Sequence, residues 1–471
     1  MYEISTLPEL EKIFAQQRLR FNHNLYPSYQ QRIKDLKALK KMVLDNQQAL
    51  INALNDDFGH RSVDDSLIGD ILTTISGINY TIKRLKLWMK PVRKHVGPLL
   101  QPAKAEVLYQ PLGVIGIIAP WNYPLFLSMG PLTAALAAGN SVMIKMSEYT
   151  PNTNRLLSEL LSKIYESDKV VIVEGDVAIA TAFSALTFDH LFFTGSTAVG
   201  KLVMKSAAEN LVPVTLELGG KSPAIIDENI DIKVAASRFI MGKTLNAGQT
   251  CVAPDYILCP RNKIDQLTNE LQIIYTKMYP KVRDNIDCTS VINQGQYSRL
   301  QYWLQEAESK GARIFSLSTD SGSNDERKMP LTLVLDGSDD MKVMNEEIFG
   351  PILPIVGYDN LSEAIDYVNA RPRPLALYIY SFEKAVQQTI LLKTHAGGVC
   401  INEAAFHVAN DDLPFGGVGA SGMGQYHGKE GFKTFSHGKS ILTRGRISFA
   451  DKLFPPFGTT MHKLVYKLFI R

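Results

Sequence analysis

One cysteine and one glutamate have the residue types and the surroundings that thiol chemistry requires. Cys251 lies in the small-residue stretch 246–254, where a thiol can approach a substrate, and Glu217 lies in the glycine-rich stretch 216–223. A thiol can attack a carbonyl carbon, and a carboxylate can activate water to hydrolyse the thioester that results. The pair predicts covalent catalysis on a carbonyl compound, although a single cysteine taken alone is more often an inert, buried thiol.

Three other groups have the composition of a binding site. Asn122 lies in the proline-bounded turn 120–124, where a rigid amide suits an oxyanion hole but is also an ordinary turn residue. The run 195–200 joins an apolar segment to a helical pattern, which is the setting for a phosphate at a helix N-terminus. It is not a GxGxxG fingerprint, so a tight structural turn fits equally well. Lys145 and Glu148 follow another apolar run and could hold ribose hydroxyls or form a solvated surface pair.

Other reactive patterns are weaker. Glu346 and Glu347 precede Phe349 and a turn, but adjacent glutamates are usually just exposed. No serine lies in a GxSxG motif, and the nine histidines show no metal-ligand spacing. The four cysteines form neither a CxxC pair nor a disulfide framework, so we expect no metal site and reduced thiols in the cytoplasm.

The segments that must position these residues alternate between apolar runs and helical patterns. Continuous apolar runs are typical of strands buried on both faces of a parallel sheet. Such runs lie at 113–119, 141–145, 170–173 and 190–194. An alanine-rich helix is predicted between the first two runs, ending at Gly139 as its C-terminal cap. The pattern predicts an α/β fold with two doubly wound lobes joined near residues 219–220.

Four further segments are predicted around these lobes. The apolar spacing over 27–58 indicates one or two amphipathic helices, and another helix is expected from 66 to 89. Residues 97–109 contain two prolines and an alternating pattern typical of an exposed strand or hairpin arm. The polar segment 316–328 predicts a surface loop.

Composition limits the classes of protein. The chain has 471 residues, 45% of them hydrophobic and 21% charged, which is the balance of a soluble protein with two or three domains. The net charge is +3 and the basic residues are dispersed, so we expect no nucleic-acid partner. The N-terminus lacks signal-peptide features, and no apolar segment has the length of a membrane span. The basic, apolar tail 462–471 is expected to dock on its own or a neighbouring subunit, with a membrane surface as the alternative.

Five motifs, in order, resemble the motif set of the aldehyde dehydrogenase superfamily. The resemblance extends from about residue 30 to 440, and the motif around Cys251 is similar to that of class 3 members. Segments 407–417 and 424–431 are similar to coniferyl-aldehyde dehydrogenases within that class. The five motifs are Pro120-Trp-Asn-Tyr-Pro, Leu216-Glu-Leu-Gly-Gly-Lys-Ser-Pro, Gly248-Gln-Thr-Cys-Val-Ala-Pro, Glu346-Glu-Ile-Phe-Gly-Pro and Pro414-Phe-Gly-Gly-Val-Gly-Ala-Ser-Gly.

The resemblance implies roles for individual residues. It makes Cys251 the nucleophile, Glu217 the general base and Asn122 the oxyanion-hole amide of an NAD-dependent aldehyde oxidation. The remaining implied residues bind the cofactor: Trp121, Lys145, Glu148, Gly195, Ser196, Gly200, Leu218, Glu347 and Phe349. NAD is favoured, with NADP possible, because Glu148 would repel a 2′-phosphate. The substrate is expected to be an aromatic aldehyde, such as coniferaldehyde, or a medium- or long-chain aliphatic one.

The resemblance also implies a domain plan and a homodimer. Residues 1–92 and 113–218 are assigned to an NAD-binding domain and 219–420 to a catalytic domain. Residues 93–112 and 421–446 are assigned to a β oligomerisation arm, and 447–471 to a C-terminal tail. The tail lacks the long apolar anchor of membrane-bound class 3 members. Met146 replaces a proline common in the family, which would loosen the strand end beside Lys145.

Three alternatives remain open at this stage. One is an acylating dehydrogenase that transfers the acyl group to coenzyme A, for which a hydrolytic base at Glu217 has no use. The second is a cofactor-independent cysteine hydrolase, which needs an activating histidine. The third is a catalytically silent protein on the same fold. Tyr123, Phe126, Phe406 and His407 are candidates for lining an apolar substrate funnel, or for packing in the core.

Overall fold

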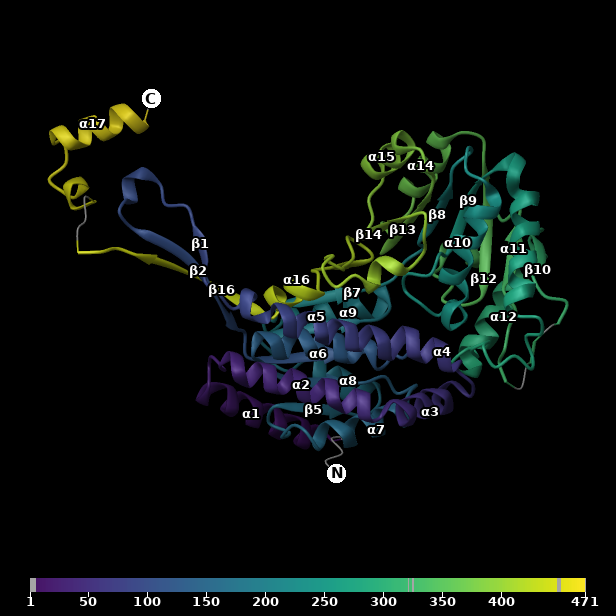
Figure 1. Ribbon diagram of the computed structural model, residues 1–471, viewed down its shortest axis with the longest axis horizontal. Helices are drawn as coiled ribbons and strands as arrows, with labels where there is room; N and C mark the ends of the chain where they lie inside the picture. The colour runs from purple at the N-terminus through teal and green to yellow at the C-terminus, as the bar shows by residue number, and fades with distance from the viewer. Residues whose placement is uncertain (1–5, 321, 324–325, 447–449, 471) are drawn as a thin grey trace.

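Three β-sheets organise the described part of the computed structural model, which covers residues 6–320, 322–323, 326–446 and 450–470 (Figure 1). Residues 1–5 of the N-terminus, three residues of the loop expected over 316–328, and residues 447–449 and 471 of the tail therefore lie outside the described residues. The two larger sheets form separate lobes, and the smallest one extends away from both.

The first lobe is built on a six-stranded sheet in the order β15-β7-β6-β3-β4-β5. All neighbours are parallel except the edge pair β15–β7. Its strands are β3 (Val114–Ile118), β4 (Ser141–Lys145), β5 (Val170–Val173), β6 (His190–Thr194), β7 (Val214–Glu217) and β15 (Gly422–Met423).

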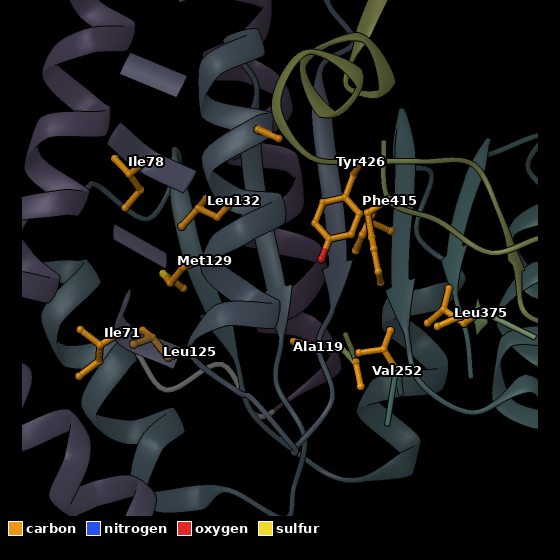
Figure 2. Close-up of a cluster of buried hydrophobic side chains, with 14 of the residues drawn as sticks. Ile71, Ile78, Ala119, Leu125, Met129, Leu132, Val252, Leu375, Phe415 and Tyr426 are labelled. Carbon is orange, nitrogen blue, oxygen red and sulfur yellow. The ribbon is translucent and has the colours of Figure 1, made fainter. Parts of the chain in front are cut away.

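Helices cover both faces of this sheet, as the continuous apolar runs require. Within β3, Ile115 and Ile117 pack in one cluster, and Val114 packs in the cluster on the opposite face. The first cluster includes side chains of α2 (Tyr29–Asp45), α3 (Gln47–Phe58), α5 (Thr73–Trp88), α6 (Phe126–Ala138) and α7 (Pro151–Ser162). It continues into the second lobe, where Val252 and Leu375 belong to it (Figure 2). The second cluster is completed by α1 (Leu7–His23), α8 (Val177–Ser184) and α9 (Thr197–Ala208).

The second lobe contains a seven-stranded sheet in the order β10-β11-β12-β9-β8-β13-β14. Only β10 runs antiparallel to its neighbour. The strands are β8 (Pro223–Ile226), β9 (Tyr256–Pro260), β10 (Arg313–Ser316), β11 (Thr332–Leu335), β12 (Ile352–Tyr358), β13 (Ala376–Tyr380) and β14 (Gly398–Ile401). The helices are α10 (Ile232–Thr244), η3 (Leu245–Gly248), η4 (Arg261–Lys263), α11 (Ile264–Met278), α12 (Gln294–Ser309), α13 (Lys342–Asn345), α14 (Leu361–Asn369), α15 (Lys384–Lys393) and η5 (Phe406–Ala409).

The third sheet is an antiparallel arm that projects from the body (Figure 1). It consists of β1 (Val92–Lys94), β2 (Lys104–Pro111) and β16 (Ser436–Thr443), with the short helix η2 (Pro98–Leu100) between the first two strands. Within the range 421–446 assigned to the arm, β15 pairs with β7 and α16 (Gly428–Thr434) packs on α5 and α6, so only β16 belongs to the arm sheet. Beyond the arm, η6 (Ala450–Leu453) and α17 (Thr460–Phe469) complete the chain.

The predicted fold class is confirmed, with two corrections of detail. The helix expected from 66 to 89 is divided into α4 (Val63–Ser66), the π-helical segment η1 (Leu67–Leu72) and α5. The proline-to-Met146 change does not loosen the end of β4, because the Met146 N–H, which a proline would lack, donates to the Val173 carbonyl at 3.3 Å. Among the described residues, no helix has the length and apolar character that crossing a bilayer demands.

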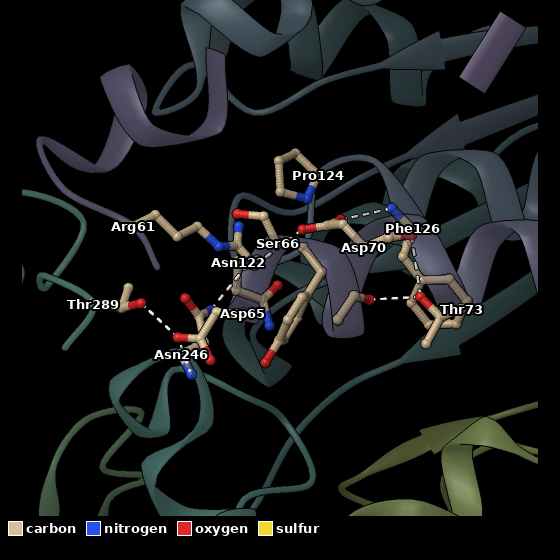
Figure 3. A network of polar contacts seen from close by, with 12 residues as sticks. Arg61, Asp65, Ser66, Asp70, Thr73, Asn122, Pro124, Phe126, Asn246 and Thr289 are labelled. Atoms are coloured by element: carbon tan, nitrogen blue, oxygen red, sulfur yellow. Dashed lines mark hydrogen bonds and ion pairs between the residues drawn. The ribbon is translucent and has the colours of Figure 1, made fainter. Parts of the chain in front are cut away.

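The π-helical segment positions a buried ion pair. Asp70 of η1 lies 2.9 Å from the Arg61 guanidinium, and both side chains are fully buried. Asp70 also accepts a hydrogen bond from the Phe126 N–H at 2.9 Å, at the start of α6 (Figure 3). The Arg61 guanidinium stacks over the rings of Phe58 and Tyr123. The pair therefore connects α4 and η1 to the turn that precedes α6.

We expect Asp70→Asn to lower the free energy of unfolding by about 3–5 kcal/mol, because removing one partner leaves a buried guanidinium without a counterion. Urea unfolding followed by circular dichroism measures the change. Asp45→Asn, which breaks the exposed pair Lys41–Asp45, is the control and should cost less than about 1 kcal/mol. Equal effects of the two substitutions would contradict this assignment.

Candidate active site

A pocket of about 240 Å³ brings together motif residues that are distant in the sequence. It lies where the first lobe meets the second, beyond the carboxyl ends of β3, β6 and β7. Its lining residues are Pro120, Trp121, Asn122, Thr194, Gly195, Ser196, Glu217, Leu218, Gly219, Cys251, Gln296, Arg299, Glu347 and Phe349. Of the residues expected in the site, Lys145, Glu148 and Gly200 are not part of this lining.

The thiol is placed by a strained turn between α10 and β9. Asn246 and Ala247 have φ of 52° and 54°, and Gly248 has φ of 73°. Consecutive non-glycine residues in the left-handed region are uncommon and persist only where their surroundings hold them. A Cβ on Gly248 would lie 2.6 Å from the Gly350 carbonyl oxygen, so the close approach of residues 248 and 350 requires glycine.

Buried polar side chains from both lobes hold this turn (Figure 3). Asp65 of α4 accepts from the Asn246 N–H at 3.1 Å and from the Thr289 hydroxyl. The Gln249 amide donates to the Asn246 and Ser290 carbonyls, each at 3.0 Å, and its oxygen accepts from a backbone N–H at 2.9 Å. These buried hydrogen bonds fix the backbone that carries Cys251.

The Asn122 amide is oriented by the same turn. Its Nδ2 donates to the Gln249 carbonyl at 3.1 Å, and its backbone carbonyl accepts from the Asn246 amide at 3.0 Å. Asn122 is 2% exposed and lines the pocket together with Cys251. One of its two amide hydrogens is therefore used to fix its orientation, and the other remains for a group in the pocket.

Glu217, the last residue of β7, is a buried carboxylate without a hydrogen-bond partner among the described residues. The side chain is 2% exposed, and burial raises its pKa well above the ordinary value. A carboxylate in such surroundings is a stronger base when it is ionised, which is the property needed to take a proton from water.

The surroundings of the Cys251 thiol do not favour its ionised form. Burial, with further contributions from Glu347 and Glu217, raises the pKa of Cys251 to about 12. Both neighbours are acidic, so they oppose rather than stabilise a thiolate. Formation of the nucleophile in this pocket therefore requires proton transfer to a base or an added positive charge.

The second carboxylate, Glu347, packs directly on the segment between β7 and β8. A Cβ on Gly219 would lie 2.2 Å from Glu347 Oε1, so only glycine leaves room for this carboxylate. Burial and Asp255 raise the pKa of Glu347 to about 8, and a hydrogen bond from the Gly220 N–H partly opposes that rise. Its neighbour Glu346 is exposed, so the structure separates the two adjacent glutamates by environment.

The other end of the pocket has the features of a cofactor site. Gly195 and Ser196 precede α9, whose N-terminus carries free N–H groups and a positive dipole end. The Thr194 hydroxyl is buried there without a partner in the described structure. Trp121 and Phe349 meet edge to face, with ring centroids 5.2 Å apart. Backbone donors, an unpaired hydroxyl and an aromatic wall fit a dinucleotide.

The expected cofactor residues outside the lining differ in position. Lys145 ends β4 beside β3 and is 2% exposed, with its ammonium donating to the Met146 carbonyl at 2.6 Å. Burial lowers its pKa. Glu148 is exposed three residues later. Gly200 lies inside α9, where a Cβ would be 2.7 Å from Leu218, so its role in this structure is close helix packing.

Sequence reasoning missed several residues that the fold brings to the site. Arg299 of α12 enters the pocket, where its guanidinium donates to Gln296 at 2.8 Å and to the Ile348 carbonyl at 2.7 Å. The side chains of Asp65 and Gln249 form hydrogen bonds that hold the turn 246–248 before Cys251. Arg299 and Asp65 lie in no motif, and a local pattern carries no signal for a contact made across lobes.

Comparisons with known proteins agree with this geometry. The model of the aldehyde dehydrogenase family matches residues 10–441. A probable coniferyl aldehyde dehydrogenase of Pseudomonas aeruginosa is 53% identical, over 98% of this chain and 97% of that protein. The substrate-bound structure of Staphylococcus aureus AldH has a TM-score of 0.92 at 38% identity, covering 98% of this chain and 99% of that one. The NAD⁺ complex of a Mycobacterium tuberculosis aldehyde dehydrogenase has a TM-score of 0.85 at 27% identity, covering 94% and 92%.

These findings confirm the family resemblance inferred from the motifs, including the likeness to class 3 members and to coniferyl-aldehyde dehydrogenases.

The raised pKa of Cys251 gives a direct chemical prediction. In cofactor-free protein, alkylation of Cys251 by iodoacetamide should accelerate continuously from pH 7 to pH 10, because the thiolate fraction is still rising. Glu347 has a pKa of about 8 and is negatively charged above that pH, so Glu347→Gln should lower the thiol pKa and speed alkylation several-fold between about pH 8 and pH 10, with little effect at pH 7. Mass spectrometry of the Cys251 peptide measures the rate.

Glu346→Gln is the matched control, because Glu346 is exposed and should leave the alkylation rate unchanged. A rate that reaches its plateau below pH 8 would show that the thiol is already ionised and would contradict the electrostatics of this pocket.

Proposed function

The chain belongs to the aldehyde dehydrogenase family, and on this premise we propose that it oxidises an aromatic aldehyde to the carboxylic acid with NAD as hydride acceptor. The observation that carries the proposal is the placement of the Cys251 thiol and the unpartnered Glu217 carboxylate in one buried pocket with the Asn122 amide. A nucleophile, a base and an oxyanion donor are the groups that oxidation through a thioester needs.

In the first half of the reaction, Cys251 attacks the aldehyde carbon and transfers its proton to a base. The second carboxylate of the pocket, Glu347, has a raised pKa and is the base for this step, which leaves Glu217 free for the second half. The developing oxyanion accepts hydrogen bonds from the Asn122 amide and the Cys251 N–H, and removing one such donor typically lowers the rate by about 10²–10³. NAD, when bound, takes up the hydride that leaves the substrate carbon.

In the second half, Glu217 removes a proton from water, and the hydroxide attacks the thioester carbon. The thioester then breaks to the carboxylic acid, with Cys251 as the leaving thiolate. The raised pKa makes ionised Glu217 a strong base, and the absence of a fixed hydrogen bond leaves both carboxylate oxygens available for water.

Cofactor binding is assigned to the other end of the same pocket. The Ser196 N–H at the start of α9 would hold the pyrophosphate beside Gly195, whose own N–H donates to the Glu217 carbonyl at 3.0 Å, and the aromatic pair Trp121 and Phe349 would border the cofactor ring. Leu218 and Gly200 shape that wall, and Glu347 would contact the nicotinamide ribose. Lys145 and Glu148, at the end of β4, would contact the adenosine ribose, which favours NAD over NADP.

We keep the domain plan proposed from the sequence, with the first lobe binding the cofactor and the second lobe carrying the nucleophile, except that only β16 of residues 421–446 belongs to the arm. The arm is proposed to join two copies of the chain into a homodimer, since β2 and β16 present partly exposed strands outside either lobe. Reduced thiols favour a cytoplasmic location.

Coenzyme A transfer and cysteine hydrolysis are tested by the same assays. No histidine is among the residues lining the described pocket, so an imidazole base for a cysteine hydrolase is not in contact with it. An acid product formed without coenzyme A favours hydrolytic oxidation. Ester cleavage unaffected by NAD, or a coenzyme A requirement, would overturn it.

We expect Glu217→Gln to retain the first burst of NADH and to lower steady turnover by at least about 10²-fold, because hydrolysis loses its general base. Stopped-flow absorbance at 340 nm separates the two phases. Cys251→Ala should abolish both, and Glu346→Gln should change neither. In the wild type, steady turnover should fall as pH falls through the raised pKa of Glu217, since the protonated carboxyl is no base. Normal steady turnover in Glu217→Gln would overturn the assignment.

We also expect kcat/KM to be higher with NAD than with NADP, because the Glu148 carboxylate repels a 2′-phosphate. Glu148→Gln should narrow that ratio by raising the efficiency with NADP. Initial rates at fixed aldehyde and varied cofactor measure it. A wild-type preference for NADP would reverse the assignment of Glu148.

A further inference from the structure

Two histidines, His427 buried and His407 half-buried, lie together in the segment that returns from the second lobe to the first. His407 is in η5 and His427 is the N-cap of α16, and both flank the Phe415 ring. The ring centroids are 6.3 Å apart for His407–Phe415 and 5.1 Å apart for the stacked pair His427–Phe415. The proposed mechanism uses neither histidine.

All four ring nitrogens of this pair are buried without a hydrogen-bond partner among the described residues. His427 is also held at a φ of 85°, a conformation that costs free energy for a non-glycine residue. A buried donor or acceptor without a partner is expensive, at about 1–3 kcal/mol each. Several such groups in one place indicate that a ligand completes them.

The pair is electrically neutral at physiological pH. Burial lowers the pKa of each histidine to about 4, and each also has aromatic neighbours. A neutral imidazole presents one N–H donor and one acceptor nitrogen. Two such rings therefore suit an uncharged group with both a hydroxyl and an ether oxygen, and they provide no cation for a carboxylate or phosphate.

The walls beside the histidines are aromatic and extend to the reactive residues. Tyr426 and Phe415 are joined by two backbone hydrogen bonds and lie side by side between the lobes (Figure 2). Burial, with smaller contributions from Glu217 and Cys251, raises the pKa of Tyr426, so this ring lies within electrostatic reach of both residues. The Tyr378 hydroxyl donates to the Val252 carbonyl, beside Cys251, and its ring contacts His407 at 6.0 Å.

On the solvent side, the same segment borders a depression of about 520 Å³ lined by α5 and by Phe406, Ala409, Asn410 and Asp411. Phe406, next to His407, is 53% exposed. A Cβ on Gly428, next to His427, would lie 2.2 Å from the Asp411 carbonyl oxygen. Through Tyr378 and Tyr426, each histidine is one aromatic ring away from the residues around the Cys251–Glu217 pair.

We propose that His407 and His427 are specificity residues that bind the ring oxygens of a 4-hydroxylated, 3-methoxylated aromatic aldehyde, one imidazole accepting the phenol hydrogen and the other donating to oxygen. The inference rests on the proposed function and adds the class of substrate to it. The aromatic walls hold the ring, and the aldehyde carbon points toward Cys251. An aliphatic aldehyde would leave the imidazoles unpaired, so it is a poorer substrate.

The test compares three aldehydes in the wild type and in His407→Phe and His427→Phe. Coniferaldehyde carries the phenol and the methoxy group, 3,4-dimethoxycinnamaldehyde lacks only the phenol hydrogen, and cinnamaldehyde lacks both oxygens. Each phenylalanine variant should lower kcat/KM for coniferaldehyde about tenfold and leave cinnamaldehyde within about twofold. His407→Asn, which keeps a donor and an acceptor, should recover part of the loss. His23→Phe, at an exposed histidine of α1, is the control.

Equal loss for all three aldehydes in both variants would mean that the histidines serve the structure alone, and it would overturn the proposal. Should the phenylalanine variants not fold, the wild type decides by itself: coniferaldehyde must exceed the dimethoxy analogue in kcat/KM at least about fivefold, and equal values overturn the recognition role. Absence of NADH with every aldehyde is a different result, because it overturns the proposed oxidation itself.

Discussion

Desolvation of a cluster of acidic groups is the physical constraint on which the site depends. Cys251, Glu217 and Glu347 line one pocket, and burial raises the pKa of each. Acidic groups that are shielded from water stay protonated until a nearby positive charge or a hydrogen-bond donor stabilises their ionised form. The pocket therefore holds its thiol in an unreactive form at rest and makes each carboxylate, once ionised, a strong base.

A second consequence of that burial is mechanical. The thiol can only face the pocket if the chain before it takes three consecutive residues of left-handed backbone, and this conformation has to be stabilised elsewhere. Asp65 from the first lobe and Gln249 from the second supply the hydrogen bonds that do so. The turn is thus held by hydrogen bonds from both lobes. The buried ion pair Arg61–Asp70 stabilises the position of α4, the helix that contains Asp65.

The segment from η5 to α16 connects the two lobes. It leaves the second lobe after β14, pairs briefly with β7 through β15, and packs α16 on α5 and α6 before entering the arm. This path brings Phe415, Tyr426 and two histidines between the lobes. This segment therefore pairs with the strand that ends at Glu217, contributes the rings of Phe415 and Tyr426, and leads into the arm.

The sequence by itself determined the strands, the order of the motifs and the family. Continuous apolar runs identify parallel strands because both faces are buried, and long glycine-containing motifs identify backbone that must approach closely at a ligand. It placed Cys251, Glu217, Asn122 and Glu347 in motifs whose convergence in one pocket could be expected. Only the tertiary structure decided the charge states, the contributions of Arg299 and Asp65, and the pairing of His407 with His427. Those properties arise from desolvation and from contacts between residues far apart in the chain, and no local pattern of residue types encodes either one.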